Sequence, residues 1–115
     1  MKKRLFLLTL PIFGLAALLA TSLKAEPGSL KILKFEADWC GVCRKMKPVF
    51  ASVARSYHGE VAFQSINVDE QVSLADSYKV ELLPTFVAVK NGKVVGRTTG
   101  YMSAAKLKSF VNKHK

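Results

Sequence analysis

The sequence predicts a single α/β domain with a small mixed four-stranded sheet flanked by helices. The chain has 115 residues, half of them hydrophobic, which suits one core of ordinary size. Strand-like and helix-like segments alternate in the first half, as they do in the βαβ crossover of a parallel pair. The second half ends with two strand-like segments around Asn91-Gly92 and a helical segment, which predicts an antiparallel hairpin covered by a helix.

The first strand and the long helix are predicted by their apolar spacing. Residues 30–37 (LKILKFEA) combine apolar and polar residues in a mixed alternation that predicts a strand. Apolar residues recur at helical spacing over residues 41–57, and His58-Gly59 ends that helix. A strand followed at once by a long helix places the connecting residues at one end of the sheet.

The remaining elements complete the βαβ and ββα order. Residues 61–68 predict the second strand, and residues 71–78 predict a short helix. Residues 84–90 and 93–99 form the hairpin, since asparagine and glycine tolerate the positive φ of its tight turn. The last helix covers residues 103–113 and begins with a serine, a favourable N-cap.

The N-terminal segment has the order of a secretory signal. Residues 1–4 are basic, and residues 5–20 form an apolar stretch. At about 1.5 Å per residue this stretch reaches about 24 Å, less than the roughly 30 Å of a bilayer core. We therefore predict a signal peptide over residues 1–25, or an N-terminal anchor if no cleavage site is accepted. Either outcome exports residues 26–115 to the periplasm, soluble after cleavage or tethered to the inner membrane.

Composition excludes several other classes of protein. The net charge is +10, but four of the 18 basic residues and no acidic residue lie in the first 25 positions. The remaining excess is scattered, which indicates a solvated surface and predicts no nucleic-acid partner. Two cysteines are too few for a disulfide framework, and only His58 and His114 could join them as zinc ligands. We expect no metal.

The pair Cys40 and Cys43 falls at the predicted junction between strand and helix. A cysteine at a helix N-terminus faces free N–H groups and the positive end of the helix dipole, which favour thiolate over thiol. We expect Cys40 to be the nucleophile and Cys43, deeper in the helix, to be the resolving thiol. A purely structural disulfide would gain little from so short a loop, and half of an intermolecular metal site is a further alternative.

This pattern resembles the thioredoxin family. Trp39-Cys40-Gly41-Val42-Cys43 is similar to the family's WCGPC, and Pro48 matches its helix-kinking proline. Further landmarks follow in the family's order: Asn67-Val68-Asp69, Leu83-Pro84-Thr85, Lys90-Asn91-Gly92 and Gly100. The resemblance covers roughly residues 30–115 and omits the family's leading strand and helix.

The resemblance implies a thioredoxin-like fold and a thiol-disulfide oxidoreductase. Cys40 would attack protein disulfide substrates and Cys43 would release the mixed disulfide, with no cofactor besides this disulfide. Pro84 would be cis and face Cys40, where Leu83 and Gly100 offer backbone to an extended substrate. The residues expected to contact substrate are Trp39, Gly41, Val42, Leu83, Pro84 and Gly100. We expect a monomer that exchanges electrons with a membrane thiol-disulfide donor or acceptor.

Three departures from the family pattern concern the site. Val42 replaces the proline between the cysteines and restores a backbone N–H there. The family's buried aspartate and its lysine partner are replaced by Lys34 and Ser65. Glu36 lies on the same strand face as Lys34 and could accept the proton of Cys43. Alternatively, Lys34 favours the Cys43 thiolate by its charge, or Lys34 and Glu36 form only a solvated or edge ion pair.

Two questions of function stay open at this stage. The motif is nearer to the reducing members of the family than to its oxidants, so we favour reduction. A binding module without catalysis, which holds a partner in the Leu83-Pro84 groove, is the alternative, and a basic membrane-surface protein is a third.

Overall fold

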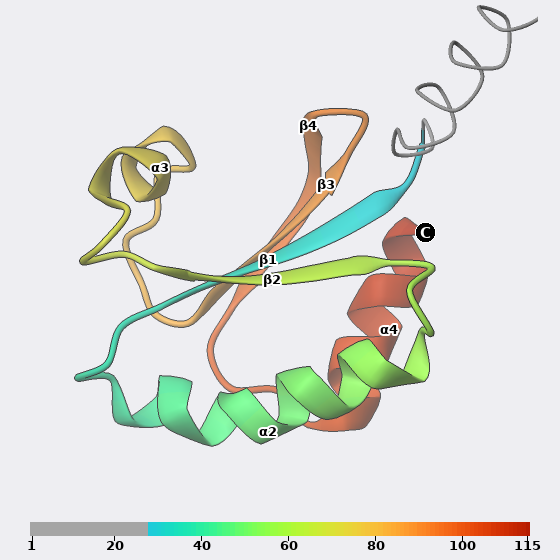
Figure 1. Ribbon diagram of the computed structural model, residues 1–115, viewed down its shortest axis with the longest axis horizontal. Helices are drawn as coiled ribbons and strands as arrows, with labels where there is room; N and C mark the ends of the chain where they lie inside the picture. Colours follow the sequence, from blue (N-terminus) through green and yellow to red (C-terminus); the bar gives the residue numbers. More distant parts are fainter. Residues whose placement is uncertain (1–27) are drawn as a thin grey trace, which may run out of the picture.

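A computed structural model describes residues 28–115, so the predicted signal peptide or anchor over residues 1–25 lies outside the described residues. Seven elements follow one another in the order that the sequence predicts (Figure 1). They are β1 (Leu30–Glu36), α2 (Gly41–Ser56), β2 (Ala62–Asn67), α3 (Val72–Ser77), β3 (Thr85–Lys90), β4 (Lys93–Thr99) and α4 (Ala104–His114).

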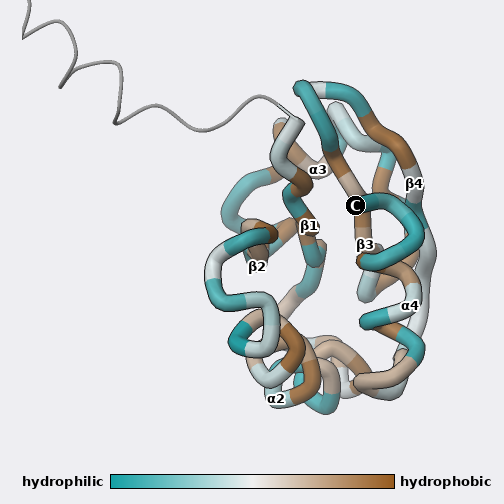
Figure 2. Tube along the Cα trace, turned by 90° about the vertical axis from the view of Figure 1, so that its right-hand side faces the viewer, coloured by the Kyte–Doolittle hydropathy of each residue, from teal (hydrophilic) through white to brown (hydrophobic). Residues whose placement is uncertain are grey.

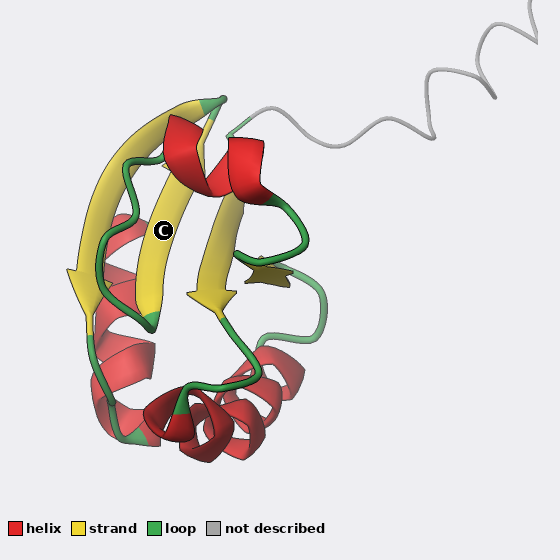
Figure 3. Ribbon diagram, turned by 90° about the vertical axis from the view of Figure 1, so that its left-hand side faces the viewer, coloured by secondary structure: helices red, strands yellow, loops and turns green. Residues whose placement is uncertain are grey.

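The strands form one mixed sheet in the order β2-β1-β3-β4. Figure 3 shows these strands in yellow, with helices on both sides of the sheet. β1 pairs with β2 in parallel and with β3 antiparallel, and β3 pairs with β4 antiparallel. The turn of this hairpin has φ of 55° at Asn91 and 75° at Gly92, as predicted. The mixed four-stranded α/β fold is thus confirmed, and β1 and β3 are its interior strands.

Helices cover both faces of the sheet, α2 and α4 on one and α3 on the other (Figure 1). Side chains of β1 alternate between the two sides, since Ile32 joins one apolar cluster and Leu33 and Phe35 join the other. Figure 2 shows hydrophobic residues recurring along α2 and the central strands. The larger cluster, beneath α2 and α4, contains Leu30, Ile32, Met46, Phe50, Val53, Tyr57, Val61, Phe86, Ala88, Met102, Leu107 and Val111.

Helix α4 begins, and helix α2 ends, at the capping residues that the sequence predicts. Ser103 caps α4, because its side chain accepts a hydrogen bond from the N–H of Lys106 at 3.2 Å. His58 and Gly59 take positive φ after α2. Tyr57, the C-cap of α2, donates to Asn112 Oδ1 of α4 at 2.7 Å, and burial raises the pKa of its phenol. Within residues 28–115, no helix is both long and apolar enough to span a membrane.

The larger cluster should carry much of the stability. Phe86 is fully buried in it, so Phe86→Ala should lower the free energy of unfolding by about 3 to 5 kcal/mol. Urea unfolding, with the midpoint shifted and the slope unchanged, measures this loss. Val94→Ala is the control, because Val94 is 49% exposed on β4 and its truncation should change stability by about 0.5 kcal/mol or less. Equal losses in the two variants would contradict this assignment of the core.

Candidate active site

The two cysteines lie where β1 gives way to α2. Cys40 is the N-cap of α2, and its Sγ accepts a hydrogen bond from the N–H of Cys43 at 3.2 Å. Cys40 and Cys43 form a disulfide with their Cα atoms 5.2 Å apart. A sulfur that already accepts an N–H at a helix N-terminus is well placed to carry negative charge when the disulfide is reduced.

The sulfur atoms differ in burial. Cys43 is fully buried and Cys40 is 8% exposed, so Cys40 offers only a narrow approach. Both pack with Ala37, and Val68 and Leu83 lie against them. An attacking partner therefore reaches Cys40 first, in agreement with the order of reaction that we expect for the pair.

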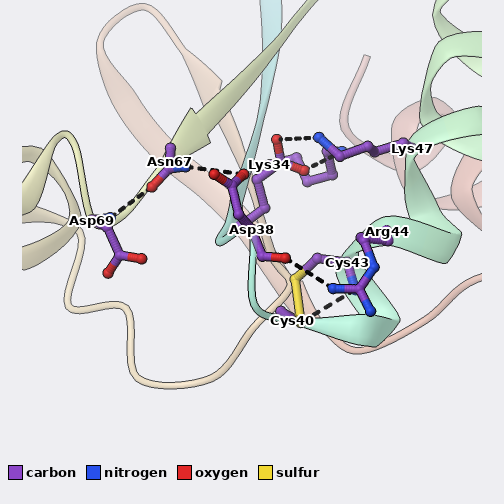
Figure 4. A network of polar contacts seen from close by, with 9 residues as sticks. Lys34, Asp38, Cys40, Cys43, Arg44, Lys47, Asn67 and Asp69 are labelled. Carbon is purple, nitrogen blue, oxygen red and sulfur yellow. Dashed lines mark hydrogen bonds and ion pairs between the residues drawn. A yellow bond between two sulfur atoms is a disulfide. The ribbon is translucent and has the colours of Figure 1, made fainter.

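Polar contacts tie the loop before Cys40 to the loop after β2 (Figure 4). Trp39, which is 68% exposed, donates from its indole Nε1 to Asp69 Oδ2 at 2.9 Å. Asn67 Nδ2 donates to Asp38 Oδ1 at 3.4 Å, and Arg44 donates to the Asp38 carbonyl at 2.9 Å. These contacts were not predicted from the sequence, although Asn67 and Asp69 belong to one of the motifs shared with the family.

The loop before β3 supplies the other wall of the site. The Leu83–Pro84 peptide is cis, as the resemblance implied, and Leu83 packs against the cluster of Ala37, Cys40 and Cys43. Gly100 has φ of +93°, and its N–H donates to the Pro84 carbonyl at 2.9 Å. Of the backbone groups expected to meet substrate, the Gly100 N–H is therefore already occupied.

Two hollows with exposed apolar side chains lie near the cysteine pair. A groove of about 360 Å³ is lined by Trp39, Cys40, Val68, Val72, Ala75, Asp76, Val80, Glu81, Leu82 and Leu83. A second hollow is lined by Val42, Lys45 and Tyr101. Among the described residues, large exposed hydrophobics of these two surfaces are Trp39, Val42, Val72, Leu82 and Tyr101. The residues on α3 and Tyr101 were not predicted, because only the fold brings them to the cysteine pair.

The expectation that Lys34 and Glu36 form a solvated or edge ion pair is wrong. They do form an ion pair, with Lys34 Nζ 2.7 Å from Glu36 Oε1, but Lys34 is 1% exposed and Glu36 is 8% exposed. Their burial follows from the position of β1 between β2 and β3, with α2 covering this face. Lys47 of α2 completes the group, with its Nζ 3.3 Å from Glu36 Oε2.

The fold and the site together define a class of protein, the proteins with a thioredoxin-like α/β fold and a Cys-x-x-Cys disulfide. In this chain the disulfide lies at a helix N-terminus beside the loop that contains the cis Leu83–Pro84 peptide. The Thioredoxin family model matches residues 21–113. The chain belongs to the thioredoxin family.

Several relatives illustrate the similarity. Thioredoxin H2-2 of Oryza sativa subsp. japonica is 43% identical over 77 residues, which cover 67% of this chain and 57% of that protein. The thioredoxin of Mycoplasma pneumoniae is 42% identical over 81 residues, or 70% of this chain and 78% of that one. The X-ray structure of Fasciola hepatica thioredoxin aligns with a TM-score of 0.74 at 36% identity, covering 87% of this chain and 94% of that one. The chain spans between 51% and 61% of the length of the first three curated relatives.

The difference between the two sulfur atoms can be measured by alkylation. In the reduced protein, iodoacetamide near neutral pH should modify Cys40 at least about ten times faster than Cys43, because only Cys40 combines access with the helix N-terminus. Peptide mass spectrometry over a time course gives both rates. Cys43→Ser and Cys40→Ser proteins serve as single-thiol controls, and equal rates at the two positions would defeat the assignment.

Proposed function

We propose that this protein is an exported thiol-disulfide oxidoreductase that reduces disulfides of protein substrates. The observation that carries the proposal is the Cys40–Cys43 disulfide, whose outer sulfur caps α2 and lines a groove with exposed apolar side chains. A structural crosslink has no need of an approachable sulfur or of an apolar rim. Apolar surface of this kind fits another polypeptide.

The reaction transfers two electrons from the dithiol to the substrate. The Cys40 thiolate attacks one sulfur of a substrate disulfide, which forms a mixed disulfide and releases the other substrate sulfur as a thiolate. The Cys43 thiolate then attacks Cys40 Sγ. This step forms the Cys40–Cys43 disulfide and releases the second substrate sulfur, so the substrate is reduced and the pair is oxidised.

Substrate would dock on the surface around Cys40. Trp39 and Leu83 line the groove beside Cys40, while Val42 lies on the second hollow next to Tyr101. An extended segment of substrate has the free backbone of Leu83 available for pairing, with Pro84 holding that loop against β4 through Gly100. Gly41 is exposed and has no side chain that would cover its own backbone.

Export and direction rest on the sequence. The basic start and the apolar stretch of residues 5–20 support export to the periplasm, with the domain released or tethered by its N-terminus. The WCGVC motif supports reduction, and an exported reductant needs a membrane thiol-disulfide donor to regenerate its dithiol. Export is tested by fractionation of cells that express the chain with and without residues 1–25. We expect only the full chain to reach the periplasm.

Trapping tests the turnover. Cys43→Ala removes the resolving thiol, so a mixed disulfide between Cys40 and its substrate should accumulate and be visible on non-reducing gels of periplasmic extracts. The adducts should disappear on reduction and should be absent from the Cys40→Ala protein, which keeps only the buried thiol. Recovery of no adduct with Cys43→Ala would contradict this route of turnover.

A further inference from the structure

A buried charged cluster lies behind the cysteine pair, and the reaction described above does not use it. It consists of Lys34 and Glu36 of β1 and Lys47 of α2, joined by ion pairs of 2.7 and 3.3 Å through the two oxygens of Glu36 (Figure 4). The Lys34 side chain is 1% exposed, that of Glu36 is 11% exposed and that of Lys47 is 53% exposed. A lysine buried this deeply is rare unless its charge is paired.

The cluster adjoins the layer of the core that holds Cys43. Ala37 packs with Cys43, and Glu36 precedes Ala37 on β1. Lys47 follows Cys43 by four residues on α2, which is about one helical turn on the same face. The Nζ of Lys34 lies 4.8 Å from the ring centroid of Phe50, which follows Cys43 by seven residues on α2. The ammonium of Lys34 therefore sits in apolar surroundings, where its field is screened less than at the surface.

The contacts of Glu36 discriminate between the roles that Lys34 and Glu36 could play. Each carboxylate oxygen already faces an ammonium group, Oε1 that of Lys34 and Oε2 that of Lys47. Both oxygens of this carboxylate are therefore engaged by ammonium groups and not by a thiol. The cluster also contains two ammonium groups for one carboxylate, so its charge balance is positive.

We propose that Lys34 is a positioning residue for resolution: the positive excess of the Lys34–Glu36–Lys47 cluster favours the thiolate of Cys43, and Glu36 orients the two lysines without acting as a base. The inference rests on the proposed function, in which Cys43 is the resolving thiol. No bond to the cluster forms or breaks. Cys43 loses its proton to solvent, its thiolate attacks Cys40 Sγ, and the departing substrate sulfur takes up a proton.

The other charged groups near the pair are exposed. On the loop before α2, Asp38 meets Asn67, and on the loop after β2, Asp69 meets the indole of Trp39. Arg44 of α2 donates to the Asp38 carbonyl. Asp76 and Glu81 line the groove beside Cys40, and Lys45 lines the second hollow. All six charged side chains belong to exposed residues, so solvent screens them. Two apolar residues pack against the cluster that contains Cys43. They are Leu83, from the loop before β3, and Val68, from the loop after β2.

A two-phase reaction with 5,5′-dithiobis(2-nitrobenzoate) separates the two thiols. Attack of Cys40 on this reagent releases one coloured thionitrobenzoate, and attack of Cys43 on the resulting mixed disulfide releases the second. Stopped-flow absorbance gives both rates, and the pH profile of the second phase reports the ionisation of Cys43. If the wild-type protein released only one thionitrobenzoate, the proposed function itself would fail, independently of Lys34.

Charge removal should shift the second phase in opposite directions. Lys34→Met should move the pH midpoint of the second phase upward, by less than the about one to three units that a direct ion pair produces. At neutral pH the second phase should become about three- to ten-fold slower. Glu36→Gln should move the midpoint downward, because it removes the only negative charge of the cluster. Lys34→Arg keeps the positive charge and should therefore have the same midpoint as the wild-type protein.

Two further variants keep the test decisive if Lys34→Met does not fold. Lys47→Met should shift the midpoint upward by less than Lys34→Met, since Lys47 is half exposed and more screened. Arg55→Met removes a positive charge from the exposed face of the last turn of α2 and should leave the midpoint unchanged. Slower resolution in Glu36→Gln, or an unchanged midpoint in both lysine variants, would overturn the proposal.

Discussion

The capping of α2 by Cys40 is the contact on which the site depends. A helix N-terminus needs an acceptor for its free N–H groups, and here the acceptor is the sulfur of Cys40, the nucleophile of the proposed reaction. The interior strand β1 delivers that sulfur to the end of the sheet, and the first turn of α2 holds Cys43 within bonding distance of it. The same backbone geometry thus creates both the reactivity of one thiol and the proximity of the other.

The residues around the cysteine pair differ between the surface and the core: the surface side is apolar, and the core side contains a buried ion pair. Outside, Trp39 and the loop of Leu83 present apolar surface, and a hydrogen bond to Asp69 fixes the indole across two loops. Inside, Lys34 and Glu36 place opposite charges in the core between the sheet and α2. Burial of charges is costly, and removing one partner of such a pair typically destabilises a protein by about 3–5 kcal/mol. The pairing of Lys34 with Glu36 therefore offsets part of the cost of burying them.

Most of the fold could be predicted from the sequence, because its periodicities, the Asn91-Gly92 turn and the Ser103 cap are local signals. The cysteine pair could also be placed, since its position after a strand and before a helix is visible in the chain. The burial of Lys34 could not be predicted, because Lys34 and Glu36 on one face of β1 are typical of a solvated face. Pairing of β1 on both sides makes this strand interior and buries them. The contact of Trp39 with Asp69 spans 30 residues and depends on how two loops meet.

The midpoint potential of the Cys40–Cys43 pair tests the central claim, that this disulfide is the working group of an exported reductant. Equilibration of the protein without residues 1–25 against glutathione buffers, followed by alkylation and mass analysis, gives this potential. The account predicts a reversible two-electron couple with a midpoint more negative than about −200 mV, on the side of thioredoxin at about −270 mV. A midpoint less negative than that, toward the about −120 mV of a strong oxidant, or a disulfide that does not equilibrate, would contradict it.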